Sequence, residues 1–260
     1  MSAGGPDHRP RPWENTSWSA LRRHTPARVG LGRVGWALPT DRVLEFRSAH
    51  ARAREAVHAR IDVDALAGDL AEVGLGRPVR VTSRAGSRAE YVRRPDLGRL
   101  PGDLSAVRFT GDQLGLVVAD GLSPNALMVH AAALVGALAA ELRDRYTIAP
   151  PVVATEARVA LGDHIAVAMG VQTLILIIGE RPGLSAVESL GIYLTHRAAP
   201  GCTDADRNCV SNIHPPDGLA YPQAARVVAR LISGARRSGR SGVALKDTGV
   251  GEDPPPALRS

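Results

Sequence analysis

Short apolar runs alternate with helical patterns over the second half of the chain, and this alternation indicates the fold class. The run at 173–178 is followed at once by Gly-Glu-Arg-Pro-Gly at 179–183, a combination typical of a fully buried strand. Strands of this kind belong to sheets that helices cover on both faces. Further strands are expected at 114–119, 152–161, 190–195 and 243–245.

Helical periodicity fills the segments between these strands. Ser123 and Pro124 supply a capping oxygen and a proline at the first helical position, and an apolar stripe follows. Its core at 131–140 is too short to span a bilayer and fits a buried helix. Two more helices are expected, near 163–169 and from Pro222. The alternation predicts an α/β fold: a Rossmann-like C-terminal domain with a mostly parallel sheet, preceded by a helical N-terminal region.

The first hundred residues have mainly helical patterns. Thr40 is a plausible N-cap, and the stripe that follows it includes Phe46 and His50, so we expect His50 to be a packed core histidine. A second helix is expected after a cap at Asp62 or Asp64, and Gly74 should end it. Short strands are expected at 77–82 and 90–93, and a loop at 95–101.

These patterns divide the chain into four segments. They are a disordered tail at 1–20, a mainly helical region at 21–102, an α/β domain at 103–247 and a second disordered tail at 248–260. Trp13 and Trp18 lie in the first tail, where they are either incidentally exposed or part of a peptide that orders on a partner.

The net charge of +6 is concentrated at 1–100, which holds 18 arginines against 11 acidic residues. A basic segment can contact nucleic acid or an acidic partner. Here the arginines are dispersed, so a solvated or protein-facing surface is favoured and no nucleic-acid partner is expected. Because the sequence shows no signal peptide and no apolar run long enough for a membrane span, we expect a cytoplasmic protein without a membrane partner.

Candidate chemistry is sparse. Gly30, Gly32 and Gly35 lack a preceding strand, which argues against a dinucleotide fingerprint. Neither a nucleophile elbow nor cysteine spacing typical of zinc sites is present. In open α/β sheets ligands bind outside the carboxyl ends of the strands, where Glu180 is expected to stand. The pattern alone leaves two interpretations of Glu180, a turn residue paired with Arg181 or a contact for a polar ligand.

Several long motifs in order carry a resemblance that runs from about residue 20 to 247. The most specific are IGERPGLSAVESLGIYLT at 178–195 and TDADRNCVSNIH at 203–214, supported by ARVALGDHI at 157–165 and VADGLS at 118–123. The sequence resembles the small (light) subunit of ethanolamine ammonia-lyase, an adenosylcobalamin enzyme.

This resemblance implies a specific role. The family's enzyme converts ethanolamine to acetaldehyde and ammonia by a radical mechanism, with the substrate bound mainly by the large subunit. The small subunit completes the cobalamin site, and the positions that match its cofactor contacts are Val159, Glu180 and Cys209. The resemblance assigns no catalytic residue and no metal ligand to this chain, and it is compatible with a bacterial microcompartment. The alternative is a cobalamin-binding scaffold protein without lyase activity.

Overall fold

The computed structural model of the chain describes residues 17–247 and residue 249. Six strands form one sheet in the order β1-β3-β2-β4-β5-β6. The strands are β1 (Val79–Thr82), β2 (Leu114–Ala119), β3 (Val152–Thr155), β4 (Thr173–Gly179), β5 (Leu190–His196) and β6 (Asn208–Ile213). The helices are α1 (Ser17–Arg22), α2 (Thr40–His58), α3 (Val63–Ala71), α4 (Arg88–Arg93), α5 (Pro124–Leu142), α6 (Leu161–Met169) and α7 (Tyr221–Ser238), with 3₁₀ turns at Leu97–Arg99 and Asp204–Asp206.

The sheet is mixed, so the prediction of a mostly parallel sheet holds for four of its six strands and not for β5 and β6. Strands β1, β3, β2 and β4 run parallel, whereas β5 is antiparallel to β4, and β6 is antiparallel to β5. The segment 180–189 is the whole connection between β4 and β5. A crossover to a parallel strand needs about a dozen residues or more, so this connection favours an antiparallel return. β1 precedes the predicted boundary at 102 and still pairs with β3 in the same sheet.

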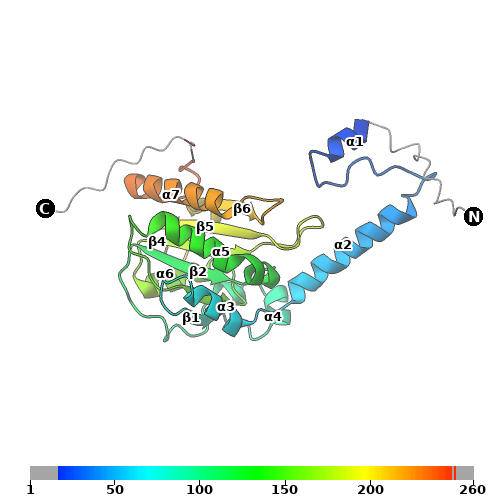
Figure 1. Cartoon of the computed structure of the whole chain (residues 1–260). Coiled ribbons are helices and arrows are strands. Elements are labelled where there is room, and N and C mark those ends of the chain that lie inside the picture. The colour runs from blue at the N-terminus through cyan, green and yellow to red at the C-terminus, as the bar shows by residue number, and fades with distance from the viewer. Residues whose placement is uncertain (1–16, 248, 250–260) are drawn as a thin grey trace, which may run out of the picture.

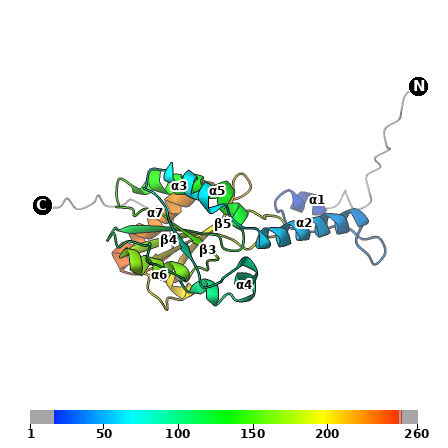
Figure 2. The same ribbon diagram turned by 90° about the horizontal axis from the view of Figure 1, so that it is seen from below.

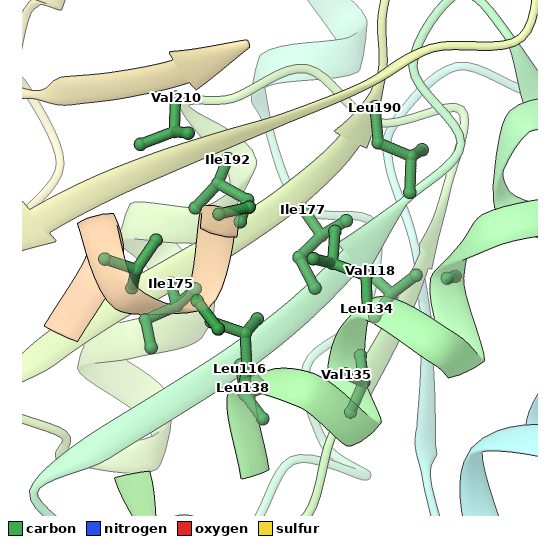
Figure 3. Close-up of a cluster of buried hydrophobic side chains, with 14 of the residues drawn as sticks. Leu116, Val118, Leu134, Val135, Leu138, Ile175, Ile177, Leu190, Ile192 and Val210 are labelled. Atoms are coloured by element: carbon green, nitrogen blue, oxygen red, sulfur yellow. The ribbon is translucent and has the colours of Figure 1, made fainter. Parts of the chain in front are cut away.

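Helices cover both faces of the sheet (Figures 1 and 2). α5 and α7 pack on one face together with α3, and α6 packs on β2 and β4 from the other. Ile175 and Ile177 of β4 therefore point toward the α5 side (Figure 3), while Leu174 and Leu176 point toward α6. Because both faces are covered, β2 and β4 are buried at every position, as the continuous apolar runs predicted.

Among the described residues, α5 is the one helix long and apolar enough, by length and composition, to cross a membrane. In this fold its apolar residues serve the core instead. Leu127, Leu134 and Leu138 are fully buried, and the helix packs against α3, α7 and β4. The expectation of a buried helix after Pro124 is confirmed.

Two predicted strands have a different structure. The segment 90–93 belongs to helix α4, because the Ser87 side chain accepts a hydrogen bond from the backbone N–H of Glu90 and caps a helical turn. The segment 243–245 forms a turn, and the edge of the sheet is occupied by β6 instead. Both segments are short, so local apolar content did not distinguish a strand from another conformation.

The prediction for 152–161 was wrong in length, since β3 ends at Thr155. The Asp120 carboxylate accepts hydrogen bonds from the backbone N–H groups of Glu156 and Ala157, at 2.8 and 2.9 Å. Glu156 takes a positive φ of 51°. The chain therefore turns away from the sheet here and enters α6, and this turn is important for the site described below.

The N-terminal elements α1 and α2 lie to one side of the sheet and its covering helices (Figures 1 and 2). The predicted inward stripe of α2 has little to pack against, and the buried residues of the helix are Ala49 and Ala56. Phe46 and His50 are exposed, so the prediction that His50 is a core histidine was wrong. The next helix, α3, starts as expected, with the Asp62 side chain accepting from the N–H of Ala65.

Both predicted tails lie mostly outside the described residues. Residues 1–16, 248 and 250–260 are not described. Trp13 and most of the predicted C-terminal tail therefore lie outside the described residues. Residues 17–20 are helical as part of α1, in which Trp18 is about half exposed, at 49%.

Candidate functional site

A cavity of about 390 Å³ lies at the carboxyl end of β4, where a ligand is expected in an open α/β sheet. Its walls come from α4, the β3–α6 turn, the end of β4 and strand β5. Side chains that line it include Tyr91, Arg158, Val159, Glu180, Arg181 and Tyr193. Two of the three predicted site residues, Val159 and Glu180, therefore lie in one cavity.

Glu180 is held in place by three hydrogen bonds. Its backbone N–H donates to the Ser189 carbonyl at 2.9 Å, and the Ser189 hydroxyl donates to Oε2 at 2.7 Å. The N–H of Asn212 donates to the same oxygen at 3.4 Å. A Cβ at position 191 would lie 2.8 Å from Oε1, so Gly191 leaves the room that the carboxylate needs. The carboxylate is thus fixed at the cavity wall by β5 and the end of β6.

Val159 reaches the cavity from the turn between β3 and α6. The Asp120 carboxylate holds this turn, and Arg88 in turn donates to Asp120 at 3.2 Å and to Glu156 at 3.3 Å. Burial raises the pKa of Asp120 to about 7, against the opposing effects of the Arg88 charge and the Ala157 N–H. This buried cluster positions Val159, which is partly buried and packs against the core on the α6 side.

Cys209 lies next to the cavity rather than in its wall. It sits on the edge strand β6, directly opposite Tyr193 of β5, and its residue surface is exposed. The two side chains are close enough to influence each other's pKa. Desolvation of the thiol raises the pKa of Cys209, the Tyr193 side chain opposes this, and the charge of Glu180 adds to it. Tyr193 therefore links Cys209 to the cavity that Val159 and Glu180 line.

A buried ion pair ties the elements of the site together. Arg207 donates from both Nη atoms to the two oxygens of Asp163, each at 2.7 Å, and both side chains are 2% exposed. Arg207 also donates to the Thr195 hydroxyl and the Cys202 carbonyl, both at 3.0 Å. Although burial opposes it, the hydrogen bonds and charge of Asp163 raise the pKa of Arg207. The pair joins α6, which follows Val159, to the segment that leads into β6 and Cys209.

Comparison with known proteins identifies the family. The family model described as ethanolamine ammonia-lyase light chain (EutC) matches residues 15–246. The chain belongs to this family. It is 62% identical to the ethanolamine ammonia-lyase small subunit of Rhodococcus erythropolis over 231 residues, which are 89% of this chain and 90% of the relative. Small subunits from Rhodopseudomonas palustris (strain BisA53) and Bradyrhizobium diazoefficiens are 51% and 47% identical, with 87% and 90% of this chain covered, and 88% and 92% of those relatives.

The two stretches that carry the resemblance most specifically map onto the site. The stretch at 178–195 contains the end of β4, the loop after Glu180 and most of β5, and the stretch at 203–214 contains β6. Sequence reasoning missed Tyr91, Arg158 and Tyr193. Tyr193 stands in the predicted strand at 190–195, where alternation along the strand could have suggested a side chain facing the ligand. Nothing in the local pattern placed Tyr91, which reaches the cavity from a helix that precedes β2.

Proposed function

We propose that the chain is the non-catalytic small subunit of an adenosylcobalamin-dependent ethanolamine ammonia-lyase. In this proposal the six-stranded sheet and the helices that cover it, from β1 onward, form a Rossmann-like unit that completes a cobalamin site shared with a large subunit. The observation that supports it most is the cavity at the end of β4, lined by Glu180 and Val159 and adjoined by Cys209 through Tyr193. Family membership supports a large-subunit partner, because the relatives are named as small subunits.

The residues present suit a part of the cofactor. A corrin ring offers carboxamide groups and an extended apolar face, and Val159 provides apolar surface beside the acceptor Glu180. Oε1 of Glu180 accepts no hydrogen bond from the described residues, which leaves it for a ligand N–H. Pockets that hold drug-sized ligands measure roughly 300–1,000 Å³, and a cobalamin is larger than such a ligand. A cavity of about 390 Å³ can therefore take only a portion of a cobalamin. The remainder of the site must come from a partner.

The division of labour follows from this geometry. The cofactor would supply the radical chemistry by which ethanolamine becomes acetaldehyde and ammonia, with the substrate bound mainly by the large subunit. This chain would hold one side of the cofactor: Val159 by packing, Glu180 by accepting a hydrogen bond and Cys209 by close approach from the edge strand. We further propose a cytoplasmic location, free or within a bacterial microcompartment.

The test uses the full chain co-expressed with the large-subunit protein of the same organism. Acetaldehyde release from ethanolamine in the presence of adenosylcobalamin is expected for the pair and not for either chain alone. A hydrogen bond to a charged acceptor contributes about 1.5–3 kcal/mol, so Glu180→Ala should raise the Kd for cyanocobalamin roughly ten- to a hundredfold. Glu188→Ala, an exposed carboxylate in the same loop, is the matched control and should leave the Kd unchanged.

The scaffold alternative predicts different results. A scaffold without lyase activity would bind cobalamin tightly as a single chain, and the co-expressed pair would release no acetaldehyde. The proposed function predicts weak binding by the chain alone, because half of the site is missing. An unchanged cyanocobalamin affinity in Glu180→Ala would remove Glu180 from the site.

A further inference from the structure

Arg158 lies in the wall of the cavity, and its guanidinium rests on a ring that is itself held in place. Its guanidinium carbon lies 4.6 Å from the centroid of the Tyr91 ring, within the range of a cation–π contact. Tyr91 is fully buried, and its hydroxyl donates to the Ala157 carbonyl at 3.0 Å. The Arg88 guanidinium also lies near this ring, at 4.8 Å. The ring that supports Arg158 is therefore fixed by a hydrogen bond and by a second cation.

The backbone of Arg158 is fixed as well. Its N–H donates to the Gly98 carbonyl at 2.8 Å. A Cβ at Gly98 would lie 2.8 Å from the Tyr91 ring and 3.0 Å from Cγ of Arg158, so a residue without a side chain is required for this contact. Asp120 holds the two preceding residues by their N–H groups. The arginine stem thus has little freedom, although its charged end faces a cavity.

The charged end lacks an acceptor within the chain. Nε of Arg158 is buried and has no hydrogen-bond partner, and no ion pair of Arg158 is found among the described residues. Buried donors in native structures are nearly always satisfied by protein, water or ligand. Arg88 and Arg207, the buried arginines of this region, each pair with a carboxylate, whereas the half-buried Arg158 pairs with none among the described residues. A guanidinium whose buried Nε has no partner, in a cavity wall that also contains Val159 and Glu180, indicates a ligand that brings its own acceptor.

We propose that Arg158 is a further ligand-binding residue of this cavity and donates hydrogen bonds to an oxygen acceptor of the cobalamin. The inference rests on the proposed function for the identity of the ligand. A planar guanidinium suits two acceptors of that molecule, the phosphodiester oxygen of its nucleotide loop and the carbonyl of a corrin carboxamide. Arg158 would then contribute a donor, Glu180 an acceptor and Val159 an apolar surface to the same cavity.

The experiment measures cofactor affinity of the assembled two-chain complex by absorbance titration and calorimetry. Arg158→Met keeps an apolar side chain that can pack on Tyr91 and removes every hydrogen-bond donor. Arg158→Lys keeps the positive charge but lacks the planar guanidinium with its paired N–H donors. We expect the Kd for cyanocobalamin to rise at least tenfold in Arg158→Met and less in Arg158→Lys. Arg93→Met, an exposed arginine of α4, should leave this Kd unchanged.

A second ligand distinguishes the two acceptors. Dicyanocobinamide lacks the nucleotide loop and its phosphate but keeps the corrin carboxamides. If Arg158 binds the phosphate, Arg158→Met changes the affinity for cyanocobalamin alone; if it binds a carboxamide, the affinities for both ligands fall. Either result supports a ligand-binding role for Arg158.

Three results would overturn the inference. The first is an unchanged Kd for cyanocobalamin in Arg158→Met with a melting temperature like that of the wild type. The second, should that variant fail to fold, is an unchanged Kd in Arg158→Lys. The third is weakened subunit assembly with unchanged affinity in the remaining complex, which would assign Arg158 to the subunit interface. If Glu180→Ala weakens binding while the Arg158 variants do not, only this inference fails; if the wild-type complex binds no cobalamin, the proposed function fails with it.

Discussion

Removal of one partner from the buried Asp163–Arg207 pair should destabilise the fold strongly. In Asp163→Asn the two 2.7 Å hydrogen bonds no longer join opposite charges, and Arg207 remains at 6% exposure as an uncompensated cation. Breaking a buried pair in this way costs about 3–5 kcal/mol. Asparagine can still accept one hydrogen bond, so we expect the lower end, about 3 kcal/mol.

The molecule contains a matched control for this change. Arg230 and Asp247 form a second fork with the same two 2.7 Å distances, but their side chains are 32% and 24% exposed. Exposed pairs contribute about 0–1 kcal/mol, so Asp247→Asn should have little effect on stability. The two variants differ mainly in burial, which isolates the effect of desolvation.

Thermal unfolding of the full-length chain is the assay. For a domain of this size 1 kcal/mol shifts Tm by about 2–4 °C, so Asp163→Asn should lower Tm by about 6–12 °C, while Asp247→Asn should lower it by at most a few degrees. The double variant Asp163→Leu/Arg207→Met should recover most of the loss, because it leaves no unpaired charge.

The reasoning is refuted if the buried and exposed variants lower Tm by the same small amount. It is also refuted if the double variant is less stable than Asp163→Asn, since the loss of stability would then come from packing and not from the unpaired charge of Arg207. Because the pair joins α6 to the segment before β6, a faster reaction of Cys209 with iodoacetamide should accompany the loss of stability in Asp163→Asn.

Two further predictions concern pH and a close backbone contact. Burial lowers the pKa of His130, which is 6% exposed, so its contribution to stability is full above about pH 6.5 and is lost as the pH falls through the lowered pKa. Tm should fall between pH 7 and pH 5, and less so in His130→Gln; a flat profile contradicts this. Gly121→Ala should lower Tm by several degrees, because φ is +55° and the new Cβ would overlap the Gly179 carbonyl oxygen; an unchanged Tm would show that the β2–α5 turn can move aside.

Local signals in the sequence were sufficient for the centre of the fold. The runs that become β2 and β4 are short and continuously apolar, and a strand buried on both faces requires that pattern. The starts of α3 and α5 were predicted from a capping aspartate at Asp62 and from a proline at the first helical position. Such signals act within a few residues, so they can be read without knowledge of the rest of the chain.

The candidate site was predictable only in part. The end of β4 was expected to present Glu180 to a ligand, and the structure places it at a cavity wall there together with Val159. The contribution of Cys209 depends on Tyr193, because only the pairing of β5 with β6 places Cys209 opposite this residue of the cavity wall. Arg158 could not be selected among the many arginines of the chain, since its distinction is a buried donor without an acceptor in the wall of this cavity, and only the folded chain shows both features.

The sequence by itself determined the central strands β2 and β4, the helices α5 and α7, the position of Glu180 at the end of β4 and, through its long motifs, the family. The tertiary structure decided the antiparallel direction of β5 and β6, the exposure of His50 and the turn that ends β3 at Thr155. The physical reason is the range of the interactions involved. Periodicity and capping act between neighbours in the chain. Other features depend on residues that only the folded chain brings together: the direction of a strand, the burial of a helix face and the hydrogen bond from the Glu156 N–H to Asp120.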